Sequence, residues 1–449
     1  MILDIRGTSL ISGWGNYPKI DANIILDSTE EDAVKAINSF DSIIAMGNAR
    51  SYGDSALGTN ILSLLPMNHF LDFDENTGIL QCEAGVLLSE ILDVAVPRGW
   101  FLSVTPGTKL ITVGGAIASD VHGKDHHVSG SFSKHVISMD VLLSSGKIIK
   151  CSQKSNADLF QATAGGMGLT GIILRAAIQL KKIESAYIKQ KLYKARNLKH
   201  IMELFEENKN VPLTMAWIDC IKGGKNMGRS ILYSGHHATA DECTAAGIKN
   251  PLDPNVPKKI TVPFNFPSFA LNSLSVRAFN FFTYHKQSSK TTSSIVSYDS
   301  FFYPLDSIYM WNRIYGKRGF TQYQFVLPMS SSAEGIDDIL KRISKSGMGS
   351  FLAVLKQLGK ENKNLISFPM EGYTLALDFP ITRKLFPFLN ELDRMVTDYG
   401  GRVYLTKDAR MSAAMFRRTY RNAEKFINYK HNIDKKNIFR SLQSERLGI

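Results

Sequence analysis

The chain has 449 residues, of which 44% are hydrophobic and 10% aromatic, so it is long enough for two packed domains and too apolar to be disordered. Its formal net charge is +12, and residues 402–449 contribute eight of these charges, with twelve Lys and Arg against four Asp and Glu. No apolar run approaches the ~20 residues of a membrane-spanning helix, and the first residues lack the pattern of a signal peptide.

The cysteines and the basic charge indicate the cellular compartment and the type of binding partner to expect. Four cysteines are scattered without CxxC spacing, which disfavours zinc ribbons and disulfides and is typical of a reducing compartment, so we expect a cytoplasmic protein. The charge suits a nucleic acid, an anionic membrane or substrate, or solvation alone. No zinc-finger or RNA-binding motif accompanies it, so we expect an anionic partner and no nucleic acid.

The first third of the chain alternates strands, helices and glycine-rich loops. An apolar strand is predicted at 22–26, and the following helix at 28–40 has Ser28 or Thr29 as its N-cap and acids in its first turn. The remaining predicted elements are a strand at 42–47, a glycine loop at 47–58, strands within 62–83, an amphipathic helix within 83–100, a glycine loop at 105–123, a hairpin at 138–151, and a helix, glycine loop and strand within 156–183.

The pattern changes between about 185 and 400, where the segments are longer and more aromatic. Strands are predicted at 319–328 and 372–381, with helices between and after them, and basic helices end the chain. Residues 262–302 are aromatic and basic, then rich in Ser and Thr. We interpret this segment as a mobile flap, and the alternative is a packed connection.

The glycine loops indicate a bound phosphate group, because small residues let backbone N–H groups approach phosphate oxygens. Gly166, Gly168 and Gly171 form a GxGxxG, but a helix precedes it and a strand follows, which reverses the order of a dinucleotide-binding fold. Three such loops in the first 175 residues therefore predict an extended ligand with a diphosphate, held by the backbone outside a Rossmann fold.

Four histidines lie close together, which raises the alternative of a metal site. His122 and His126 have i,i+4 spacing, but nearby glycines disfavour a helix there and no HExxH pattern is present, so we expect no metal. We interpret His126, His127 and His135 as polar loop residues bonded to the backbone. His122 closes a run of small residues, and we place it against the ligand.

Several segments together resemble the flavin domain of the vanillyl-alcohol oxidase (PCMH-type) superfamily. They are GNARSYGDSAL, PGTKLITVGGAIASDVHGKDHHVSGSFSKHV and GGMGLTGII, in this order. DVHGKDHH and QYQFV are similar to the branch that oxidises lipid-linked pentoses, and the resemblance continues to GGRVYLTKDAR. It implies a two-domain α+β fold, with a discontinuous FAD-binding domain (residues 1–185, with a C-terminal segment 402–449 returning to it) and a substrate-binding domain (186–401) built on an antiparallel sheet.

The resemblance also implies a set of flavin contacts and a noncovalent FAD. Many members attach FAD through a histidine in the first glycine loop, and this chain has Arg50 and Ser51 there, neither of which provides that linkage. The residues that match the family's flavin contacts are Ala45, Met46, Gly47, Asn48, Ala49, Arg50, Ser51, Tyr52, Gly53, Asp54, Ser55, Gly107, Thr112, Val113, Gly114, Gly115, Ser119, Asp120, Val121, His122, Ile173 and Tyr404.

Two residues are candidates for the catalytic proton transfer. Lys407 matches a lysine that the family places at the active site, where a cation would orient the hydroxyl and stabilise anionic reduced flavin; as a base it would need a pKa lowered by burial. His122 is the other candidate base, because a histidine titrates closer to neutrality. The sequence does not rank the two, and the alternative for Lys407 is a solvated side chain beside Asp408.

Five residues are candidates for substrate contacts. Gln322 and Gln324 alternate along a strand, so both side chains share one face, which is directed either to sugar hydroxyls or to solvent. By resemblance, Lys356 matches a pocket lysine that would meet the substrate phosphate or a hydroxyl. Tyr303 and Trp217 are predicted as pocket walls, with ordinary core aromatics as the alternative.

Two positions depart from the pattern of the mycobacterial members of this branch. Ala376 stands where they have a cysteine, and Thr374 stands where they have an asparagine. Neither side chain is needed for hydride transfer, so we expect the departures to affect pocket shape and sugar preference rather than the oxidation.

The resemblance implies FAD-dependent oxidation of a polyprenyl-phosphate pentose at the C2 hydroxyl, giving a 2-keto sugar. This would be the first half of a 2′-epimerisation in cell-envelope polysaccharide synthesis, completed by a separate NAD(P)H-dependent reductase, with peripheral contact at the inner face of the plasma membrane. One alternative is a soluble alditol or sugar-1,4-lactone oxidase on the same fold. Another is a non-enzymatic, basic surface-binding protein that keeps the fold only as a scaffold.

Overall fold

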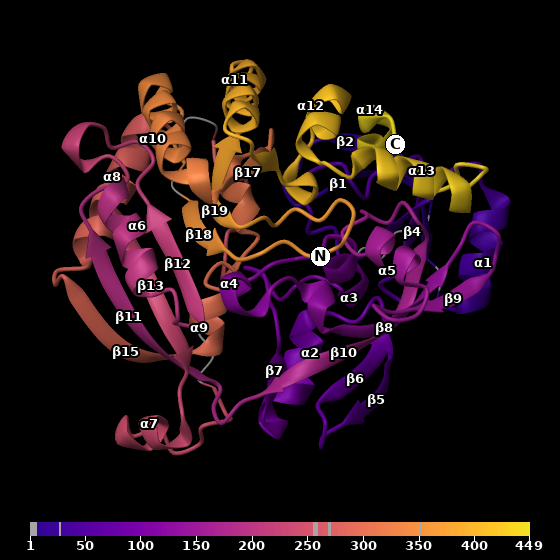
Figure 1. The fold of residues 1–449 in the computed structure, drawn as a ribbon, viewed down its shortest axis with the longest axis horizontal. Helices are drawn as coiled ribbons and strands as arrows, with labels where there is room; N and C mark the ends of the chain where they lie inside the picture. The colour runs from indigo at the N-terminus through magenta and orange to yellow at the C-terminus, as the bar shows by residue number, and fades with distance from the viewer. Residues whose placement is uncertain (1–6, 27, 255–258, 268–270, 351) are drawn as a thin grey trace.

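The structure is a computed structural model that describes residues 7–26, 28–254, 259–267, 271–350 and 352–449. Figure 1 shows a large sheet on one side of the molecule and smaller N-terminal sheets on the other, with the C-terminal helices beside the N-terminal strands. Helices and mostly antiparallel strand pairs make up the fold, which is therefore α+β, as predicted.

The N-terminal part contains two sheets. Their strands are β1 (Gly7–Ser12), β2 (Lys19–Leu26), β3 (Ile44–Met46), β4 (Asn60–Ser63), β5 (Phe70–Asp74), β6 (Ile79–Glu83), β7 (Trp100–Leu102), β8 (Val136–Leu142), β9 (Ile148–Cys151) and β10 (Ile172–Lys182). The first sheet has the order β1-β2-β4-β3, with β2 and β3 parallel to β4. The second has the order β5-β6-β10-β8-β9, and β7 also pairs with β10.

The large sheet has eight strands, and every pair in it is antiparallel. Its strands are β11 (Tyr187–Ala195), β12 (Leu213–Ile218), β13 (Ser230–His237), β15 (Thr291–Ser297), β17 (Phe320–Pro328), β18 (Ala353–Leu358), β19 (Gly372–Pro380) and β20 (Arg402–Val403). Their order is β15-β11-β13-β12-β18-β19-β17-β20, and a separate parallel pair joins β14 (Ile260–Thr261) to β16 (Ile308–Tyr309).

The helices lie between and around these sheets. The α-helices are α1 (Glu30–Ser39), α2 (Leu88–Ala95), α3 (Val113–Ala118), α4 (His126–Ser129), α5 (Ala157–Thr163), α6 (Leu198–Glu207), α7 (Ala240–Ala245), α8 (Ser273–Lys286), α9 (Tyr298–Phe302), α10 (Met329–Ser346), α11 (Leu385–Asp398), α12 (Ala413–Thr419), α13 (Ala423–Ile433) and α14 (Leu442–Leu447). The 3-10 turns are η1 (Val96–Arg98), η2 (Phe132–His135), η3 (Gly224–Asn226), η4 (Trp311–Tyr315) and η5 (Leu405–Lys407).

The predicted elements of the first third are found in the structure, except that the glycine loop expected at 105–123 contains the helix α3. The helix expected at 28–40 is α1, and Thr29 is its N-cap, with its hydroxyl accepting from the N–H of Asp32. The hairpin expected at 138–151 is β8 paired with β9. The helix, glycine loop and strand expected within 156–183 are α5, residues 164–171 and β10.

The large sheet has two chemically different faces because side chains alternate along each strand. On β17, Tyr323, Phe325 and Leu327 belong to a buried cluster shared with α6, α10 and α11. Gln322 and Gln324 therefore lie on the opposite face, which is the face directed away from these helices. A sheet covered by helices on one side leaves its other side for the site described below.

The C-terminal segment is bound to both parts of the chain. β20 extends the large sheet by pairing with β17, and the N–H of Tyr404 donates to the carbonyl of Gln324 at 2.9 Å. Further along, the N–H of Leu442 donates to the carbonyl of Leu57 at 2.7 Å, which holds the last helix against the N-terminal loop. The side chains of this segment between β20 and the last helix are therefore held between the N-terminal part and the large sheet.

The predicted flap at 262–302 is wrong for its last third, where the alternative of a packed connection holds. Thr291–Ser297 is the edge strand β15, paired with β11, and the following α9 is mostly buried. An edge strand needs pairing on one side only, so Ser and Thr are accepted on its exposed positions. Residues 268–270 of the predicted flap lie outside the described residues.

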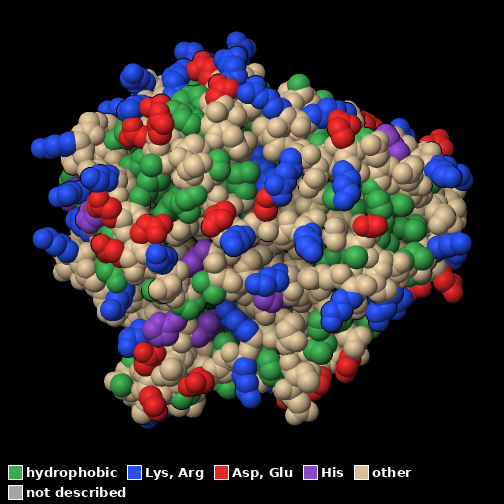
Figure 2. All heavy atoms as spheres, in the orientation of Figure 1, with side chains coloured by type: hydrophobic (Ala, Val, Ile, Leu, Met, Phe, Trp, Pro, Cys, Tyr) green, Lys and Arg blue, Asp and Glu red, His purple; other side chains and the backbone are tan. Residues whose placement is uncertain are grey.

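Most cations of residues 402–449 are neutralised within the molecule. Ion pairs with acids involve Arg402, Arg410, Arg417, Arg418, Arg421, Lys430 and Arg446. Figure 2 shows Lys and Arg mixed with Asp and Glu over one face of the molecule rather than gathered in one patch. The excess of positive charge in residues 402–449 therefore forms a weaker anion-binding surface than the sequence suggests.

The four cysteines are free and buried. Across the described ranges, the helices are too short or too polar for any of them to cross a membrane.

Candidate active site

Three distant segments meet on the face of the large sheet opposite α6, α10 and α11. Lys407 ends η5, directly after β20, so the pairing of β20 with β17 carries it to the strand that holds Gln322 and Gln324. The N-terminal loop joins them, because the N–H of Tyr52 donates to the carbonyl of Thr406 at 3.1 Å. The Lys407 Nζ lies 3.9 Å from the centroid of the Tyr52 ring.

The first glycine loop offers unpaired backbone donors. Among the described residues, the N–H groups of Asn48, Ala49, Arg50 and Ser51 make no hydrogen bond, although the loop is half-buried. Ala49 has a φ of 48°, so the backbone turns through the left-handed region there. Consecutive free N–H groups in a turning backbone bind anions, which fits the diphosphate of FAD.

The same loop packs tightly on its neighbours. A Cβ added at Gly47 would overlap the Oγ1 of Thr112, which caps α3 by accepting from the N–H of Gly115 at 3.1 Å. Arg50, which stands at the place of the family's linking histidine, lies over the ring of Trp14 at 4.1 Å. The loop is thus held in place by packing, with its donors left open for a ligand.

His122 is buried at the centre of the site. The Gln324 amide lies 3.0 Å from its Nε2, and the same amide donates to the Oγ1 of Thr374 at 3.2 Å. The amide nitrogen of Gln324 can only donate, so the His122 Nε2 accepts and the proton of the neutral ring is on Nδ1. Burial lowers the pKa of His122 well below its usual value, and the charge of Lys356 adds to this. Nδ1 has no partner within the described part of the chain, so a donor is left for a ligand.

Two aromatic rings complete the wall beside His122. Phe368 and Tyr404 stack with centroids 4.5 Å apart, and each lies about the same distance from the histidine ring, at 5.4 and 5.3 Å. The Tyr404 hydroxyl donates to the carbonyl of Ser119 at 2.9 Å. A planar, buried aromatic surface with one polar ring suits the face of an isoalloxazine.

Asp120 holds this region together. It is fully buried with a φ of 40°, and its carboxylate accepts from the Ser133 N–H at 3.0 Å, from Asn362 at 2.6 Å, from Asn364 at 2.9 Å and from the Ser367 hydroxyl at 2.6 Å. The loop that precedes β19 is thereby fixed over the segment leading to His122. The side chain of Asp120 is occupied by protein donors and its N–H donates to the carbonyl of Ile117 at 2.9 Å, so its predicted flavin contact would have to use the backbone carbonyl.

Rows of side chains across the sheet line the site. Strand register places Gln324, Ala376, Val354 and Trp217 side by side, since residues directly opposite in antiparallel strands share a face. On the same face, the neighbouring rows of cross-strand partners place Thr374 beside Lys356 and Gln322 beside Asp378. Gln322 and Gln324 thus face the site and not open solvent, and Gln324 is buried.

The site contains lysines whose ammonium groups are made easier to deprotonate by burial. Burial lowers the pKa of Lys407 to about 7; the Asp378 carboxylate opposes this and the charge of Lys356 reinforces it. Burial lowers the pKa of Lys356 to about 8, and that of Lys124 to about 7. Both Lys407 and Lys356 are half-buried. Clusters of groups shifted toward neutrality are typical of sites that move protons or bind anions.

The other histidines of this segment are engaged with protein atoms. His126 Nδ1 accepts from the N–H of Gly359 at 3.0 Å, His127 bonds the carbonyl of Val211 at 2.9 Å, and His135 bonds the carbonyl of Ser129 at 3.0 Å. They are polar residues bonded to the backbone, as interpreted, but His126 and His127 lie in α4 and His135 in η2 rather than in a loop. Within the described ranges, no three His, Cys, Asp or Glu side chains are grouped as metal ligands.

Three predicted residues lie away from this centre or deep in the core. Tyr303 is fully buried in the N-terminal core cluster, with its hydroxyl 2.6 Å from that of Thr105. Ile173 is buried on β10 opposite Val141. Gly107 is exposed, with open space where a Cβ would stand. Their roles as ligand contacts remain predictions.

The structure also brings in residues that the sequence did not single out. Phe368 stacks on Tyr404, Asp378 bonds Gln322, and Lys124 donates to the carbonyl of Phe302 at 2.9 Å. Asp378 lay in the predicted strand at 372–381, but nothing in that run distinguished it. Only the register with β17 shows that it faces the site.

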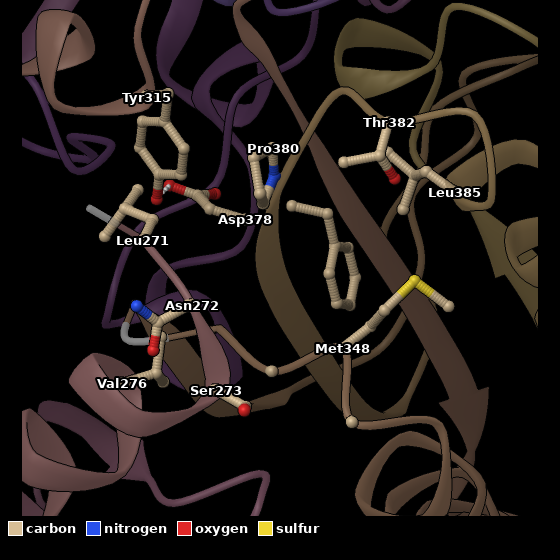
Figure 3. A pocket seen from close by; sticks show the side chains of 13 residues that line it. Leu271, Asn272, Ser273, Val276, Tyr315, Met348, Asp378, Pro380, Thr382 and Leu385 are labelled. Carbon is tan, nitrogen blue, oxygen red and sulfur yellow. Dashed lines mark hydrogen bonds between the residues drawn. The ribbon is translucent and has the colours of Figure 1, made fainter. Parts of the chain in front are cut away.

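A cavity of about 160 Å³ adjoins the polar end of the site. Figure 3 shows Asp378 and Tyr315 side by side at one end of it, facing Leu271, with Met348 and Leu385 farther along. The lining is mostly apolar away from Asp378.

Comparisons with known proteins agree with this arrangement. The model of the FAD binding domain family matches residues 24–152. The chain is 35% identical over 452 residues to the decaprenylphosphoryl-β-D-ribose oxidase of Mycolicibacterium smegmatis, with 98% of each chain covered. It is 33% identical over 115 residues to the L-gulonolactone oxidase of Mus musculus, which covers 25% of this chain and 26% of that protein.

The first of these relatives is similar along almost the whole length, whereas the second is similar over a quarter of this chain. A likeness of this extent, together with the matched flavin-binding domain, establishes the family and the cofactor. The chain belongs to the vanillyl-alcohol oxidase (PCMH-type) superfamily of FAD-dependent oxidoreductases, within the family of decaprenylphosphoryl-β-D-ribose oxidases.

Proposed function

We propose that residues 1–185 and 402–449 form one FAD-binding domain and that residues 186–401 form the substrate-binding domain. The contacts of the C-terminal segment with the N-terminal part support this division, including the ion pair of Arg446 with Asp54. We propose further that FAD is held noncovalently, since Arg50 and Ser51 stand where a linking histidine would be required. The free N–H groups of the first glycine loop would hold the diphosphate.

Replacing Gly53 with Ala is expected to impair FAD retention. A Cβ at this position would overlap the carbonyl oxygen of Asp408, so the first glycine loop and the segment after Lys407 would have to separate. The measurement is the flavin absorbance that remains per protein after desalting. The control is Gly223→Ala, because Gly223 is exposed and a Cβ there meets only Ser344 at 3.4 Å. Equal flavin content in both variants would contradict the tight packing.

We propose that the chain oxidises the C2 hydroxyl of a polyprenyl-phosphate pentose to a 2-keto sugar. The observation that carries this is the similarity to the decaprenylphosphoryl-β-D-ribose oxidase over 98% of both chains, which includes the substrate-binding part as well as the flavin-binding part. The site supports it, since amide side chains suited to sugar hydroxyls stand beside half-buried lysines suited to a phosphate.

FAD, when bound, accepts a hydride from the carbon that bears the hydroxyl. The protein must orient that carbon and remove the hydroxyl proton. Lys407 is the better proton acceptor, because its pKa of about 7 leaves part of it neutral at physiological pH. His122 is a poor base, since its Nε2 already accepts from Gln324 and burial disfavours its protonation. We assign His122 to binding through its free Nδ1–H.

The substrate contacts follow from the same face of the sheet. Gln322 and Gln324 would bind sugar hydroxyls, and Lys356 would meet the phosphate, as a half-buried cation beside Thr374. Trp217 would form a wall of the pocket at the far end of its row. Thr374 positions the Gln324 amide, since it accepts from it and donates to the carbonyl of Phe325.

A 2-keto sugar is an intermediate rather than an end product of an epimerisation. Its reduction from the opposite face needs a second hydride donor, so we propose a separate NAD(P)H-dependent reductase as partner. The two reactions together would invert C2 of the pentose in the synthesis of cell-envelope polysaccharides.

The substrate proposal is tested by comparing reductants of the bound flavin without oxygen. Polyprenyl-phosphoryl ribose is expected to bleach the flavin band rapidly, and ribose 5-phosphate, which lacks the lipid, is expected to do so poorly. Xylitol and L-gulono-1,4-lactone test the alternative of an alditol or lactone oxidase. Faster bleaching by either of these soluble compounds would overturn the lipid-linked substrate.

We propose that residues 259–267 and 271–290 contact the inner face of the plasma membrane. These residues include four Lys and Arg and no Asp or Glu. Buried Val276 and Asn280 anchor α8, and Asn280 donates to Asp219 at 2.8 Å. The exposed apolar side chains of this part of the chain are Ile260, Phe264, Leu274, Phe279, Phe281 and Phe282. Exposed aromatics among cations without acids suit an anionic lipid surface.

The double variant Phe281→Ser, Phe282→Ser is expected to bind vesicles of phosphatidylcholine and phosphatidylglycerol about tenfold more weakly, because each exposed ring contributes apolar area to insertion. Sedimentation with the vesicles gives the bound fraction. Phe70→Ser is the control, since Phe70 is also exposed but lies on β5, far from α8 (Figure 1). Equal binding by the double variant and the wild type would exclude this surface.

A further inference from the structure

Asp378 is a buried carboxylate to which the oxidation described above assigns no role. It is 1% exposed on β19, directly opposite Gln322 on β17. The Gln322 amide donates to its Oδ1 at 2.6 Å, and the Tyr315 hydroxyl donates to its Oδ2 at 3.3 Å. Its own N–H donates to the hydroxyl of Ser350 at 3.0 Å. The carboxylate is therefore fixed in orientation by two neutral donors.

A buried carboxylate usually carries a cation in contact with it. Six other buried aspartates of this chain do so, namely Asp54, Asp219, Asp299, Asp393, Asp408 and Asp434. Asp120 and Asp125 are also buried without an ion pair within the described residues, and Asp120 is instead bound by four neutral donors. Asp378 makes no ion pair of 4 Å or less within the described residues. Burial raises its pKa to about 7, while the hydrogen bond from Gln322 and the charge of Lys407 oppose this.

Lys407 is the charged group connected to Asp378 through packed rings. The Lys407 Nζ lies against the Tyr52 ring, which packs edge-on against Phe320 at 5.3 Å between centroids, and Phe320 stacks at 4.1 Å on Tyr315, whose hydroxyl bonds Asp378. The electrostatic influence is mutual, since Asp378 favours the ammonium form of Lys407 against burial and against the charge of Lys356. The groups that face Lys407 are thus Asp378 from β19, Lys356 from β18 and the Tyr52 ring from the N-terminal loop. His122 also feels the charge of Lys407. Asp378 is the one acid among them.

The surroundings of the carboxylate leave it room to exchange a proton. Figure 3 shows Asp378 at the wall of the cavity of about 160 Å³, with the Tyr315 hydroxyl directed at it. This volume is large enough to hold several waters. The carboxylate thus stands between the interior of the site, through Gln322, and the cavity, through Tyr315.

We propose that Asp378 is a positioning residue for the oxidation, whose carboxylate sets the charge of Lys407 from across the β17–β19 pair. It acts through Lys407 and Gln322 and does not itself meet the reacting carbon. Its effect on the reaction rests on the proposed function of Lys407, whereas its effect on the protonation of Lys407 does not.

Asp378→Asn is expected to shift the pH dependence of the reaction to lower pH. Asp378→Asn removes the one carboxylate that raises the pKa of Lys407, so this pKa falls below about 7. If neutral Lys407 takes the hydroxyl proton, the rising limb of the pH profile moves to lower pH. If charged Lys407 is required, the falling limb moves to lower pH instead. The limb that moves therefore reveals which form of Lys407 is active.

The direct test is the titration of Lys407 itself in the FAD-loaded protein. Trace acetylation with acetic anhydride across a pH series, read by mass spectrometry of the peptide with Lys407, gives its pKa without any substrate. In Asp378→Asn the value is expected to fall by about one pH unit or more, as for loss of a nearby opposite charge. Asp378→Glu, which keeps the charge, is expected to return it toward the wild-type value.

Two further variants keep the test decisive. Asp393→Asn removes a similar buried carboxylate, bonded by Tyr323 on the helix-covered face of the sheet, and is expected to leave the Lys407 titration in place. Tyr315→Phe removes a hydrogen-bond donor from Asp378 and is expected to lower the pKa of Lys407 by a smaller amount. This variant provides the test if Asp378→Asn loses FAD. An unchanged Lys407 titration in both Asp378→Asn and Tyr315→Phe would overturn the proposal.

Anaerobic flavin reduction by polyprenyl-phosphoryl ribose, measured over the same pH series, then connects the titration to the reaction. A shift in both measurements supports the positioning role. If the Lys407 titration shifts but polyprenyl-phosphoryl ribose does not reduce the flavin, the effect of Asp378 on Lys407 is supported. The proposed substrate is then excluded. A rise in KM with an unmoved pH profile would instead assign Asp378 to structure alone.

Discussion

Lys407→Ala is expected to abolish reduction of the flavin by substrate while leaving FAD bound. Lys407 is the half-buried cation that lies against Tyr52 and opposite the sheet face with Gln322, and its pKa of about 7 suits proton transfer. Loss of a positioned acid–base group lowers rates by about a hundredfold or more. Stopped-flow absorbance of the flavin band gives the rate of reduction, and the spectrum before mixing gives the FAD content.

Lys425→Ala is the matched control, because Lys425 is exposed on α13 in the same C-terminal segment. It is expected to reduce its flavin at the wild-type rate. Full turnover by Lys407→Ala would refute the catalytic assignment. Loss of FAD from that variant would place Lys407 in cofactor binding instead.

Asp120→Asn is expected to lower the free energy of unfolding by about 3 kcal/mol or more. Three donors converge on the Oδ2 of Asp120, from Asn362, Asn364 and Ser367. An amide nitrogen at this position would meet donors with a donor, and the buried groups would lose their acceptor. Urea unfolding followed by tryptophan fluorescence gives the free energy. FAD retention is expected to fall as well, since the segment leading to His122 is no longer fixed.

Asp41→Asn is the control for the loss of a carboxylate, because the Asp41 side chain is exposed. It is expected to unfold like the wild type. A change of less than about 1 kcal/mol in Asp120→Asn would show that the four hydrogen bonds are replaceable by water or by rearrangement.

The parts of the fold with strong local signals were predictable. The N-cap Thr29 and the acids after it specify the start of α1, and the Ser-Gly turn specifies the β8–β9 hairpin. The strands β17 and β19 are rich in apolar and aromatic residues, and each ends at a proline. The edge strand β15 was missed, because its Ser and Thr carry no hydrophobic alternation and it is stabilised by backbone pairing with β11.

The candidate site was predictable only in its separate pieces. His122 and Gln324 lie 202 residues apart, and their contact depends on how the N-terminal part meets the large sheet. Asp378 faces the site because β19 pairs with β17 in one register, and a shift of one residue would turn it to the helices. The binding capacity of the C-terminal charge was overestimated for a similar reason, since acids outside the segment, such as Glu361 and Asp54, pair with its arginines.

The most direct test of the proposed function is a single turnover without oxygen, trapped with sodium borodeuteride. The purified protein is mixed with an equal amount of polyprenyl-phosphoryl ribose, the flavin band is followed, and the sugar is then reduced with borodeuteride and examined by mass spectrometry. The account predicts loss of the flavin band and deuterium at C2 of the pentose. A flavin that stays oxidised, or deuterium at another carbon, would contradict it.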